Sequence, residues 1–308
     1  MADLNAVYQE FGLSGLVQHS LRDGSRGRQM LLEKIAAGDP LYYVRSSINA
    51  PFLLVKDDIY QTYVFTNAAE AQQKREELSL NKFRTSVELL SSMGSIEDAF
   101  LQIFELGSAS IFLDDTLSLP ISRFTKIPQY DGLPNEEHML RNRILNGAIF
   151  YYMQIANAQM SNMEAEKQWA KRMFNGKFLL TAHDDKGHGY PLTVTEIKGK
   201  PCFTIYTDWR HVGLDFNERP AGILSTFEDL EQLLQQHPGF SIVLNRPTCH
   251  LMLDSKMLTM IQQSATNSGF QASAAISGKL QITSKLGLQQ ASEDDWDKGD
   301  PTPDWLKL

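Results

Sequence analysis

The sequence predicts an α+β protein built from two tandem homologous modules, each a small, mainly antiparallel sheet with packed helices, joined by a helical connector. Two observations predict this fold. Short landmarks recur in the same order along the chain, and each copy alternates helical and strand patterns in the same way. The chain has 308 residues, of which 42% are hydrophobic. At about 100–200 residues per domain, this length allows two domains that each bury a core.

Four pairs of landmarks support the duplication. In the first two pairs the copies are 138 residues apart (176 − 38 and 203 − 65), and in the last two they are 131 apart (228 − 97 and 241 − 110). The pairs are Gly38 with Gly176, Phe65-Thr66 with Phe203-Thr204, residues 97–98 with 228–229, and residues 110–113 with 241–244. One change of offset predicts a loop that is seven residues shorter in the second copy.

Each copy is expected to run helix, three strands, variable loop, helix and strand. The first helix ends at Gly38 or Gly176, since a left-handed glycine commonly terminates a helix. The later helix begins at Ser95 or Thr226, each followed three residues on by an acid that completes the cap. The expected strands cover residues 41–44, 51–55, 62–65 and 109–113, and then 178–180, 191–196, 201–205 and 241–244.

These elements divide the chain into six segments. An apolar stripe at residues 140, 144, 148, 151 and 155 predicts a helical connector, and a capping box from Ser161 to Glu164 predicts a break at 157–162. The segments are an N-terminal helical segment (1–27), module 1 (28–130), the connector (131–162), module 2 (163–265), a short β-like extension (266–291) and an acidic tail (292–308).

The charge and cysteine content exclude several classes of function. The net charge is −8, whereas nucleic-acid-binding proteins usually present a basic face. Only two cysteines are present, which is unlike a disulfide-rich secreted protein. Residues 1–3 do not open a signal peptide, and no apolar run approaches the ~18 residues of a membrane span. We therefore expect a cytoplasmic protein that binds neither membranes nor nucleic acids.

The segment 183–189 is the most suggestive of metal chemistry. His183, Asp185 and His188 are residue types that bind divalent metals. However, their spacing matches no zinc or calcium signature, and Asp, Gly and Lys are also what a turn between strands requires. We favour a polar hairpin loop and expect no cofactor. A metal-assisted hydrolase that uses these three side chains stays as the alternative.

A second pair of candidates is Cys249 with His250. Neighbouring residues on a strand point to opposite faces, and no third group that could orient a nucleophile is identifiable. We expect Cys249 in the core and His250 exposed, and no catalytic residue in the chain. Cys202 is likewise expected to be a small core residue.

Four aromatic and basic residues are candidates for binding a partner. Trp209 and Arg210 follow the third strand of module 2, and Trp and Arg are enriched at binding hot spots. Packing of Trp209 on its own sheet is the simpler interpretation. Trp296 and Trp305 lie in the acidic tail, which carries six acids and two lysines. Since large aromatic side chains are costly to leave in water, these two either dock on the body or bind another molecule.

The chain resembles the SseB (enhanced serine sensitivity) family, in particular its N-terminal-type domain, which would be present twice. The resemblance rests on Leu41-Tyr42-Tyr43-Val44, on the Phe-Thr pairs at 65–66 and 203–204, and on Asn245-Arg246-Pro247. It covers roughly residues 28–125 and 163–260. It implies a cytoplasmic bacterial domain with a suspected role in interaction or regulation, and no catalytic residues. Module 1 departs from the pattern, with Asp114-Asp115-Thr116 at the third motif.

We therefore expect a non-catalytic cytoplasmic protein that binds another protein. Two alternatives remain open, namely the hydrolase described above and a sensor that binds a small ligand between the modules. The partner and the oligomeric state are not identifiable from the sequence.

Overall fold

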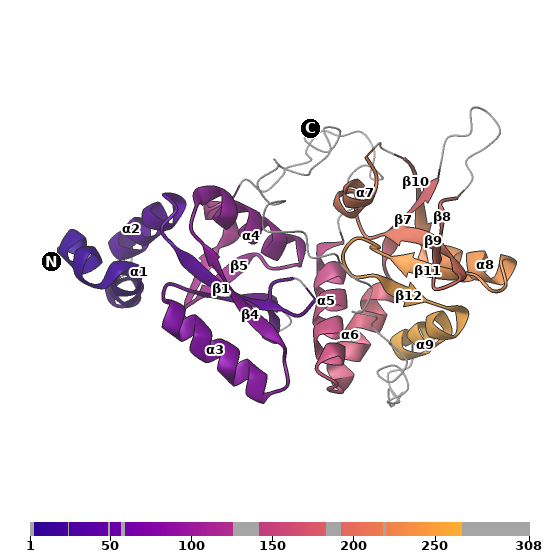
Figure 1. The fold of residues 1–308 in the computed structure, drawn as a ribbon, viewed down its shortest axis with the longest axis horizontal. Helices are drawn as coiled ribbons and strands as arrows, with labels where there is room; N and C mark the ends of the chain where they lie inside the picture. Colours follow the sequence, from indigo (N-terminus) through magenta and orange to yellow (C-terminus); the bar gives the residue numbers. More distant parts are fainter. Residues whose placement is uncertain are drawn as a thin grey trace. The chain divides into compact units, whose positions relative to one another are not determined.

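The computed structural model describes residues 3–23, 25–48, 50–56, 59–125, 142–182, 192–217 and 220–266 (Figure 1). The chain divides into two compact units. Unit 1 comprises Met1–Gln129 with Ile149–Met160, and unit 2 comprises Tyr130–Ala148 with Ser161–Leu308. Each unit contains one mixed sheet with helices, so the predicted α+β fold with two similar modules is confirmed.

Unit 1 is built on the sheet order β4-β1-β3-β5-β6, with β2 paired to β3. The β3–β5 pair is parallel and the other pairs are antiparallel. Its elements are α1 (Leu4–Asp23), α2 (Ser25–Ala36), β1 (Leu41–Ser46), β2 (Leu53–Lys56), β3 (Ile59–Phe65), α3 (Ala68–Leu80), β4 (Thr85–Leu90), α4 (Met93–Glu105), β5 (Ser110–Leu113), β6 (Leu117–Pro120) and a 3-10 helix (Ile121–Arg123).

Unit 2 repeats this order as β10-β7-β9-β11-β12, with β8 paired to β9. The helix α5 (Arg143–Asn157) contains the division between the units, which falls after Ala148. The other elements are α6 (Met163–Phe174), β7 (Lys177–Ala182), β8 (Val194–Ile197), β9 (Lys200–Tyr206), α7 (Trp209–Asp215), β10 (Ala221–Thr226), α8 (Phe227–Gln236), β11 (Ser241–Leu244), β12 (Leu251–Leu253) and α9 (Ser255–Thr266).

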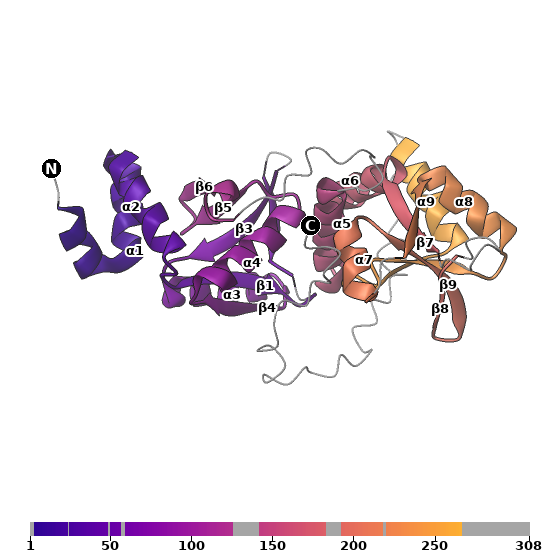
Figure 2. The same ribbon diagram turned by 90° about the horizontal axis from the view of Figure 1, so that it is seen from above.

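Helices cover both faces of each sheet. In unit 1, one face packs in a core with α2 and α4, and the other packs against Ala71 and Leu78 of α3 (Figure 1). In unit 2, α7 lies on one side of the sheet, whereas α6, α8 and α9 lie on the other (Figure 2). The helices follow from this packing, because an amphipathic helix gains most of its stability by burying its apolar stripe.

The strand registers establish which residues of the two units are equivalent. Val64 of β3 pairs with Leu113 of β5, and Ile205 of β9 pairs with Leu244 of β11. The predicted offset of 131 residues is therefore confirmed at β5 and β11. The predicted match of Phe65-Thr66 with Phe203-Thr204 is wrong, because the register pairs Phe65-Thr66 with Tyr206-Thr207. A shared Phe-Thr dipeptide concealed this shift of three residues.

The segment that the sequence predicts to be a variable loop, between the third expected strand and the later helix, contains regular structure in both units. It forms α3 and β4 in unit 1, and α7 and β10 in unit 2. A further strand, β6 or β12, follows the last predicted strand. The predicted order of helix, three strands, helix and strand was therefore incomplete by one helix and two strands.

Helix ends agree with the predicted caps in some places only. Thr226 and Asp229 form the predicted capping box, and Gly38 is left-handed with φ of 93°. In unit 1 the cap is Ser92, one turn before the predicted Ser95, which instead occupies the third helical position. Gly176 is not left-handed. The helix α6 is instead capped at its C-terminus by Asn175, whose φ is −94°.

The break in the connector is confirmed, because α5 ends at Asn157 and α6 begins at Met163. The cap of α6 is Asn162 instead of the predicted Ser161. Ala148 and Ile155 of the predicted stripe are buried, but Ile144 is 42% exposed and Leu140 lies outside the described residues. Among the described helices, none is long and apolar enough to cross a membrane.

Candidate functional site

A cluster of polar side chains lies at the ends of the parallel strands of each unit. The chain leaves β3 or β9 through Thr66 or Thr207, and it leaves β5 or β11 through Asp114 or Asn245. Since the carboxyl ends of adjacent parallel strands meet at one edge of a sheet, each Thr contacts its partner across that edge. We call these two sets of residues the strand-end clusters. The cluster of unit 2 contains more polar side chains than that of unit 1.

Asp208 is the centre of the strand-end cluster of unit 2. It caps α7, because its Oδ1 atom accepts a hydrogen bond of 3.0 Å from the backbone N–H of His211. The same oxygen lies 2.8 Å from Nδ1 of His211. The other oxygen, Oδ2, accepts hydrogen bonds from Asn146 of α5 at 2.9 Å and from the hydroxyl of Thr207 at 3.1 Å. A carboxylate that is 4% exposed is thereby surrounded by donors.

Asn245 connects this cluster to β11. Its backbone is left-handed, with φ of 47°, a conformation that Asn tolerates better than most residues. Its Oδ1 atom accepts from the backbone N–H of Thr207 at 2.9 Å, and its Nδ2 atom donates to the Thr207 hydroxyl at 2.9 Å. The Asn245 side chain therefore joins the ends of β9 and β11 at the point where the backbone hydrogen bonds between the two strands end.

The electrostatics of the cluster favour an ionised Asp208. Burial by itself would raise the pKa of Asp208, because it penalises the charged form. The neighbouring His211, together with hydrogen bonds from His211 and Asn146, outweighs burial and lowers the pKa well below its usual range. An ionised carboxylate can only accept hydrogen bonds, so the proton between these two side chains belongs to Nδ1 of His211.

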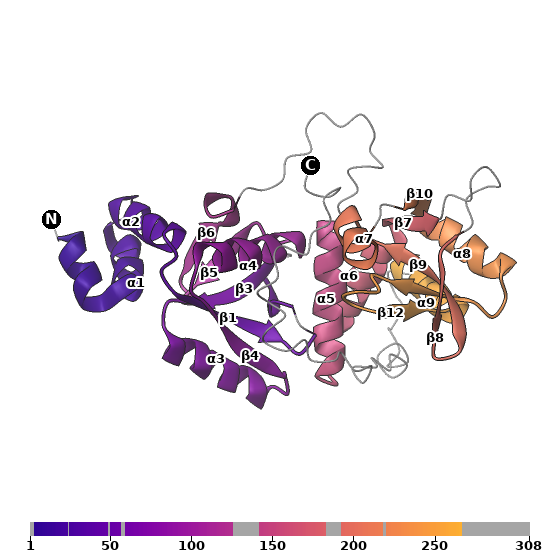
Figure 3. The ribbon, with the colours of Figure 1, turned by 45° about the horizontal axis from the view of Figure 1, so that its top comes forward.

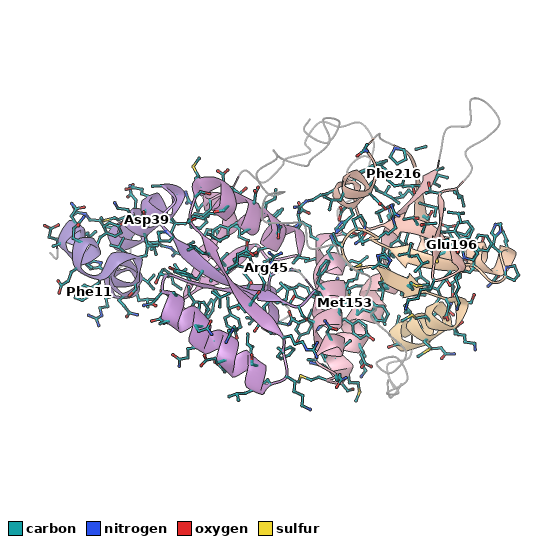
Figure 4. All side chains as sticks on the ribbon, in the orientation of Figure 1. Phe11, Asp39, Arg45, Met153, Glu196 and Phe216 are labelled. Carbon is teal, nitrogen blue, oxygen red and sulfur yellow. The ribbon has the colours of Figure 1, made fainter. Side chains whose placement is uncertain are left out.

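A second ionic group borders the cluster. Arg246 forms an ion pair with Asp215, with 2.8 Å between its Nε atom and Oδ2 of Asp215, and the Tyr206 hydroxyl donates to the same carboxylate. Burial and the carboxylate of Asp215 raise the pKa of Tyr206 above its ordinary value. Phe216, which follows α7 and is labelled in Figure 4, packs edge-on to the Tyr206 ring. These contacts fix the C-terminal end of α7, as Asp208 fixes its start.

The arrangement does not form a nucleophilic relay. In such a relay, the acid orients one ring nitrogen of the histidine and the nucleophile bonds to the other. Here the Thr207 hydroxyl lies 3.4 Å from Nδ1 of His211, which is the nitrogen that faces Asp208. Because that nitrogen carries the proton, it cannot accept one from Thr207. The geometry supports a structural role for this network.

Unit 1 has the same cluster with the acid and the amide exchanged. Thr66 donates to Asp114 twice, from its backbone N–H at 2.8 Å and from its hydroxyl at 2.7 Å. Asn67 caps α3, in the position that Asp208 occupies in unit 2. Burial raises the pKa of Asp114, although the two bonds from Thr66 act in the opposite direction. Next to it, Asp115 forms an ion pair of 2.9 Å with Lys74.

Two of the four predicted partner-binding residues, Trp209 and Arg210, lie in the part of the chain that the structure describes. Trp209 is half-buried and packs against the cluster of Leu179, Tyr206 and Val212. Its ring leaves no room for a Cβ at Gly222, which would lie 2.6 Å from the indole, so Trp209 packs on β10 of its own sheet. Arg210 is half-buried on α7. Trp296 and Trp305 lie outside the described residues.

The structure also locates the thiols. Cys249 is buried and His250 is exposed, as predicted, and both precede β12 in a turn. Burial raises the pKa of the Cys249 thiol to about 12, so it carries no thiolate at neutral pH. Cys202 is also buried in the core, as expected. Within the described part of the chain, no three His, Cys, Asp or Glu side chains are grouped to hold a metal. His183, Asp185 and His188 lie outside it.

The strand-end clusters are almost without a signal in the sequence. The only local signal is that Asp208 precedes His211 by three residues, the spacing of a helix cap. The sequence predicts that β9 ends at residue 205. Thr207 and Asp208 therefore fall in the expected variable loop, where no helix cap is expected. The contacts of Thr207 with Asn245 and of Asp208 with Asn146 join residues far apart in the chain, and no local pattern predicts them.

Comparisons with known proteins add no assignment. No family model matches the chain, and no curated protein matches it. Among solved structures, it is similar to Tic22 from Plasmodium falciparum with 11% sequence identity, over 76% of this chain and 96% of that chain. The TM-score is 0.18. A similarity at this level supports no conclusion about fold or function.

Proposed function

We propose that this chain is a non-catalytic protein-binding or regulatory protein of the SseB-like type. Its strand-end clusters support this proposal, because their polar groups hydrogen bond to one another and the Asp208–His211 pair is not arranged for nucleophilic attack. The residue pattern shared with the SseB family supports it as well. We propose the bacterial cytoplasm as its location on the same pattern and on the composition of the chain.

The observation that carries the proposal is an open edge strand at the same place in both units. β4 and β10 have six residues each and end the strand order of their sheets, so among the described strands each pairs on one side only. Each exposes a large apolar side chain, Leu89 at 51% and Ile223 at 42%. An exposed edge is a template for another strand, and many domains bind extended peptides by strand addition.

The partner that fits such an edge is an extended segment of another protein. Its backbone would pair with β4 or β10, and apolar side chains would cover Leu89 or Ile223. In unit 2, the predicted binding residue Trp209 packs on Gly222 of the same strand, on the face opposite to that of Ile223. Main-chain pairing would provide the affinity and these side chains the selectivity.

The test is affinity capture with the full chain and three single variants, followed by mass spectrometry. Leu89→Lys and Ile223→Lys place a charge on each edge, which discourages strand addition. Leu80→Lys is the matched control, because Leu80 is 87% exposed at the end of α3 and lies on no strand. The proposal predicts a partner that the control retains and that one or both edge variants lose. Equal recovery by all three variants, or no partner at all, would contradict it.

A chain that ends at Gln290 tests the contribution of Trp296 and Trp305. If the tail recognises the partner, the shortened chain loses it while both edge variants keep it. That result would replace the edge by the tail as the binding element. If the shortened chain keeps the partner and Ile223→Lys loses it, recognition lies on unit 2 itself.

A further inference from the structure

Three threonines of unit 2 meet where β8 takes the place of β7 beside β9. The bridge between Ala182 and Leu192 sets Thr193 opposite Thr181, and the pair of Val194 with Phe203 sets Thr193 opposite Thr204. Backbone bonds confirm this, since Thr193 donates to the carbonyl of Thr181 at 2.8 Å and accepts from Thr204 at 3.3 Å. Directly opposed residues project from the same face. We call this group the threonine triad; Figure 3 shows the β8–β9 hairpin, in which Thr204 belongs to β9, and Thr193 directly precedes β8.

The hydroxyl groups of the triad are buried and have no hydrogen-bond partner among the residues that the structure describes. Thr181 is 0% exposed and Thr204 is 1% exposed, and the Oγ1 atom of Thr193 is buried as well. Buried polar groups in folded proteins are nearly always hydrogen-bonded, to the protein, to water or to a ligand. Three such groups at one point of a sheet therefore indicate a binding site.

Unit 1 shows what these positions hold when they serve packing alone. By the same register, the equivalent residues are Val44, Phe52 and Tyr63. They belong to one apolar cluster, in which the rings of Phe52 and Tyr63 stack at 6.2 Å. Unit 2 keeps the strand register and has three threonines in place of one aliphatic and two aromatic side chains.

The apolar surroundings of the triad are divided accordingly. Tyr206 and Cys202 lie two residues to either side of Thr204 on β9 and share its face. Tyr206 belongs to the cluster with Leu179 and Val212, and Cys202 belongs to a separate cluster with Val243. The triad is thus a polar interruption between two apolar patches.

We propose that the threonine triad binds a small uncharged molecule that carries an amide or hydroxyl group. Each Thr hydroxyl both donates and accepts, which suits a ligand with both kinds of group. The triad itself carries no charge, so a charged ligand would lose its hydration there without gaining an opposite charge. The two flanking apolar patches suit a ligand with a short carbon skeleton. The rings of Phe52 and Tyr63, which occupy the equivalent positions in unit 1, indicate the size of that skeleton. This site is independent of the proposed edge binding.

The test is nuclear magnetic resonance of the full chain with its threonine methyl groups labelled. The probes are acetamide and acetate, which share a shape and differ in charge. Acetamide is expected to shift the signals of Thr181, Thr193 and Thr204 saturably, and acetate is not. Loss of one hydroxyl in Thr193→Val or Thr204→Val should weaken acetamide binding about three- to tenfold.

Thr259→Val is the matched control, because Thr259 is exposed on α9 and should leave the affinity unchanged. Val has nearly the shape of Thr, and Thr193 is only half-buried, so Thr193→Val keeps the test valid if the Thr204 variant fails to fold. Absence of a saturable shift with acetamide would overturn the proposal. An equal response to acetate, or an unchanged affinity in Thr193→Val, would do the same.

Discussion

Units 1 and 2 share one topology but differ in what they place on it. Unit 1 covers one face of its sheet with a helix of 13 residues, α3, over a continuous aromatic cluster. In the described part of unit 2, that face carries the seven-residue α7, and the threonine triad lies between two apolar clusters. The strand-end clusters also exchange their acid and amide. One backbone plan therefore supports a packed face in one copy and a polar one in the other.

This difference can be measured because Trp169 and Trp209 lie in unit 2, whereas the segments of unit 1 contain no Trp. The fluorescence of these residues in urea reports on unit 2, and far-ultraviolet circular dichroism reports on both units.

The largest effect is expected in the aromatic cluster of unit 1. Phe52 is 3% exposed, so Phe52→Ala should reduce the free energy of unfolding by about 3–5 kcal/mol. The equivalent Thr193→Ala removes a smaller side chain without a hydrogen-bond partner and should cost less than about 1 kcal/mol. Urea unfolding followed by circular dichroism and fluorescence measures both. Equal costs would contradict the assigned difference between a packing position in unit 1 and a polar position in unit 2.

Exchanging the amide and the acid should have unequal effects. Asn245→Asp places a second carboxylate next to Asp208 at a position that is 0% exposed, and should cost about 2–4 kcal/mol. Asp114→Asn can reproduce the bonds that Asn245 makes, and should change stability by less than about 1 kcal/mol. Urea unfolding at pH 7 tests both variants. An Asn245→Asp variant with an unchanged free energy of unfolding would contradict the assignment of a buried, water-free strand-end cluster in unit 2.

Asp208 and Asp114 should give the stabilities of the two units opposite dependences on pH. The folded pKa of Asp208 is lowered, so its stabilisation is present above the unfolded pKa of about 3.9 and is lost as the pH falls below it. The folded pKa of Asp114 is raised, so its contribution is present below about 3.9 and is lost as the pH rises through the folded value. Urea unfolding between pH 3 and 7 should show these slopes, and they should flatten in Asp208→Asn and Asp114→Asn respectively.

The smallest effect is expected at the helix caps. Asn67 caps α3 by accepting a single bond of 2.7 Å from the backbone N–H of Ala69, so Asn67→Ala should cost about 1 kcal/mol. Asp208→Ala should cost more, because it also removes the partner of Asn146 and His211. Thermal unfolding of the two variants provides the comparison. A larger loss for Asn67→Ala would contradict the assigned difference between the clusters.

The features that the sequence predicts are those with local signals. The cap from Thr226 to Asp229, the strand at 241–244 and the break after Asn157 are each encoded within a few residues. The helix α3 was missed because only Ala71 and Leu78 face its core, which leaves no apolar stripe to detect. The strand β4 that follows it has one buried residue, Leu90, and no alternation of buried and exposed positions.

The candidate sites depend on contacts between distant segments. Thr207 meets Asn245 because β9 and β11 are parallel neighbours, and Thr181 meets Thr193 because β8 replaces β7 in the sheet. Each of these residues by itself is an ordinary polar residue in or next to a strand. Only the registers bring them together, and the wrong match of Phe65-Thr66 shows how a three-residue error in register conceals such a cluster.

Hydrogen exchange of the full chain with and without its captured partner tests the proposed function most directly. The account predicts that amides of β10, of β4 or of both become protected, because a strand added at these edges would pair with their outward backbone groups. Ile223→Lys or Leu89→Lys should abolish that protection at its own edge, while Leu80→Lys should preserve it. Protection confined to other segments, with β4 and β10 unchanged, would contradict the proposal that these edges bind the partner.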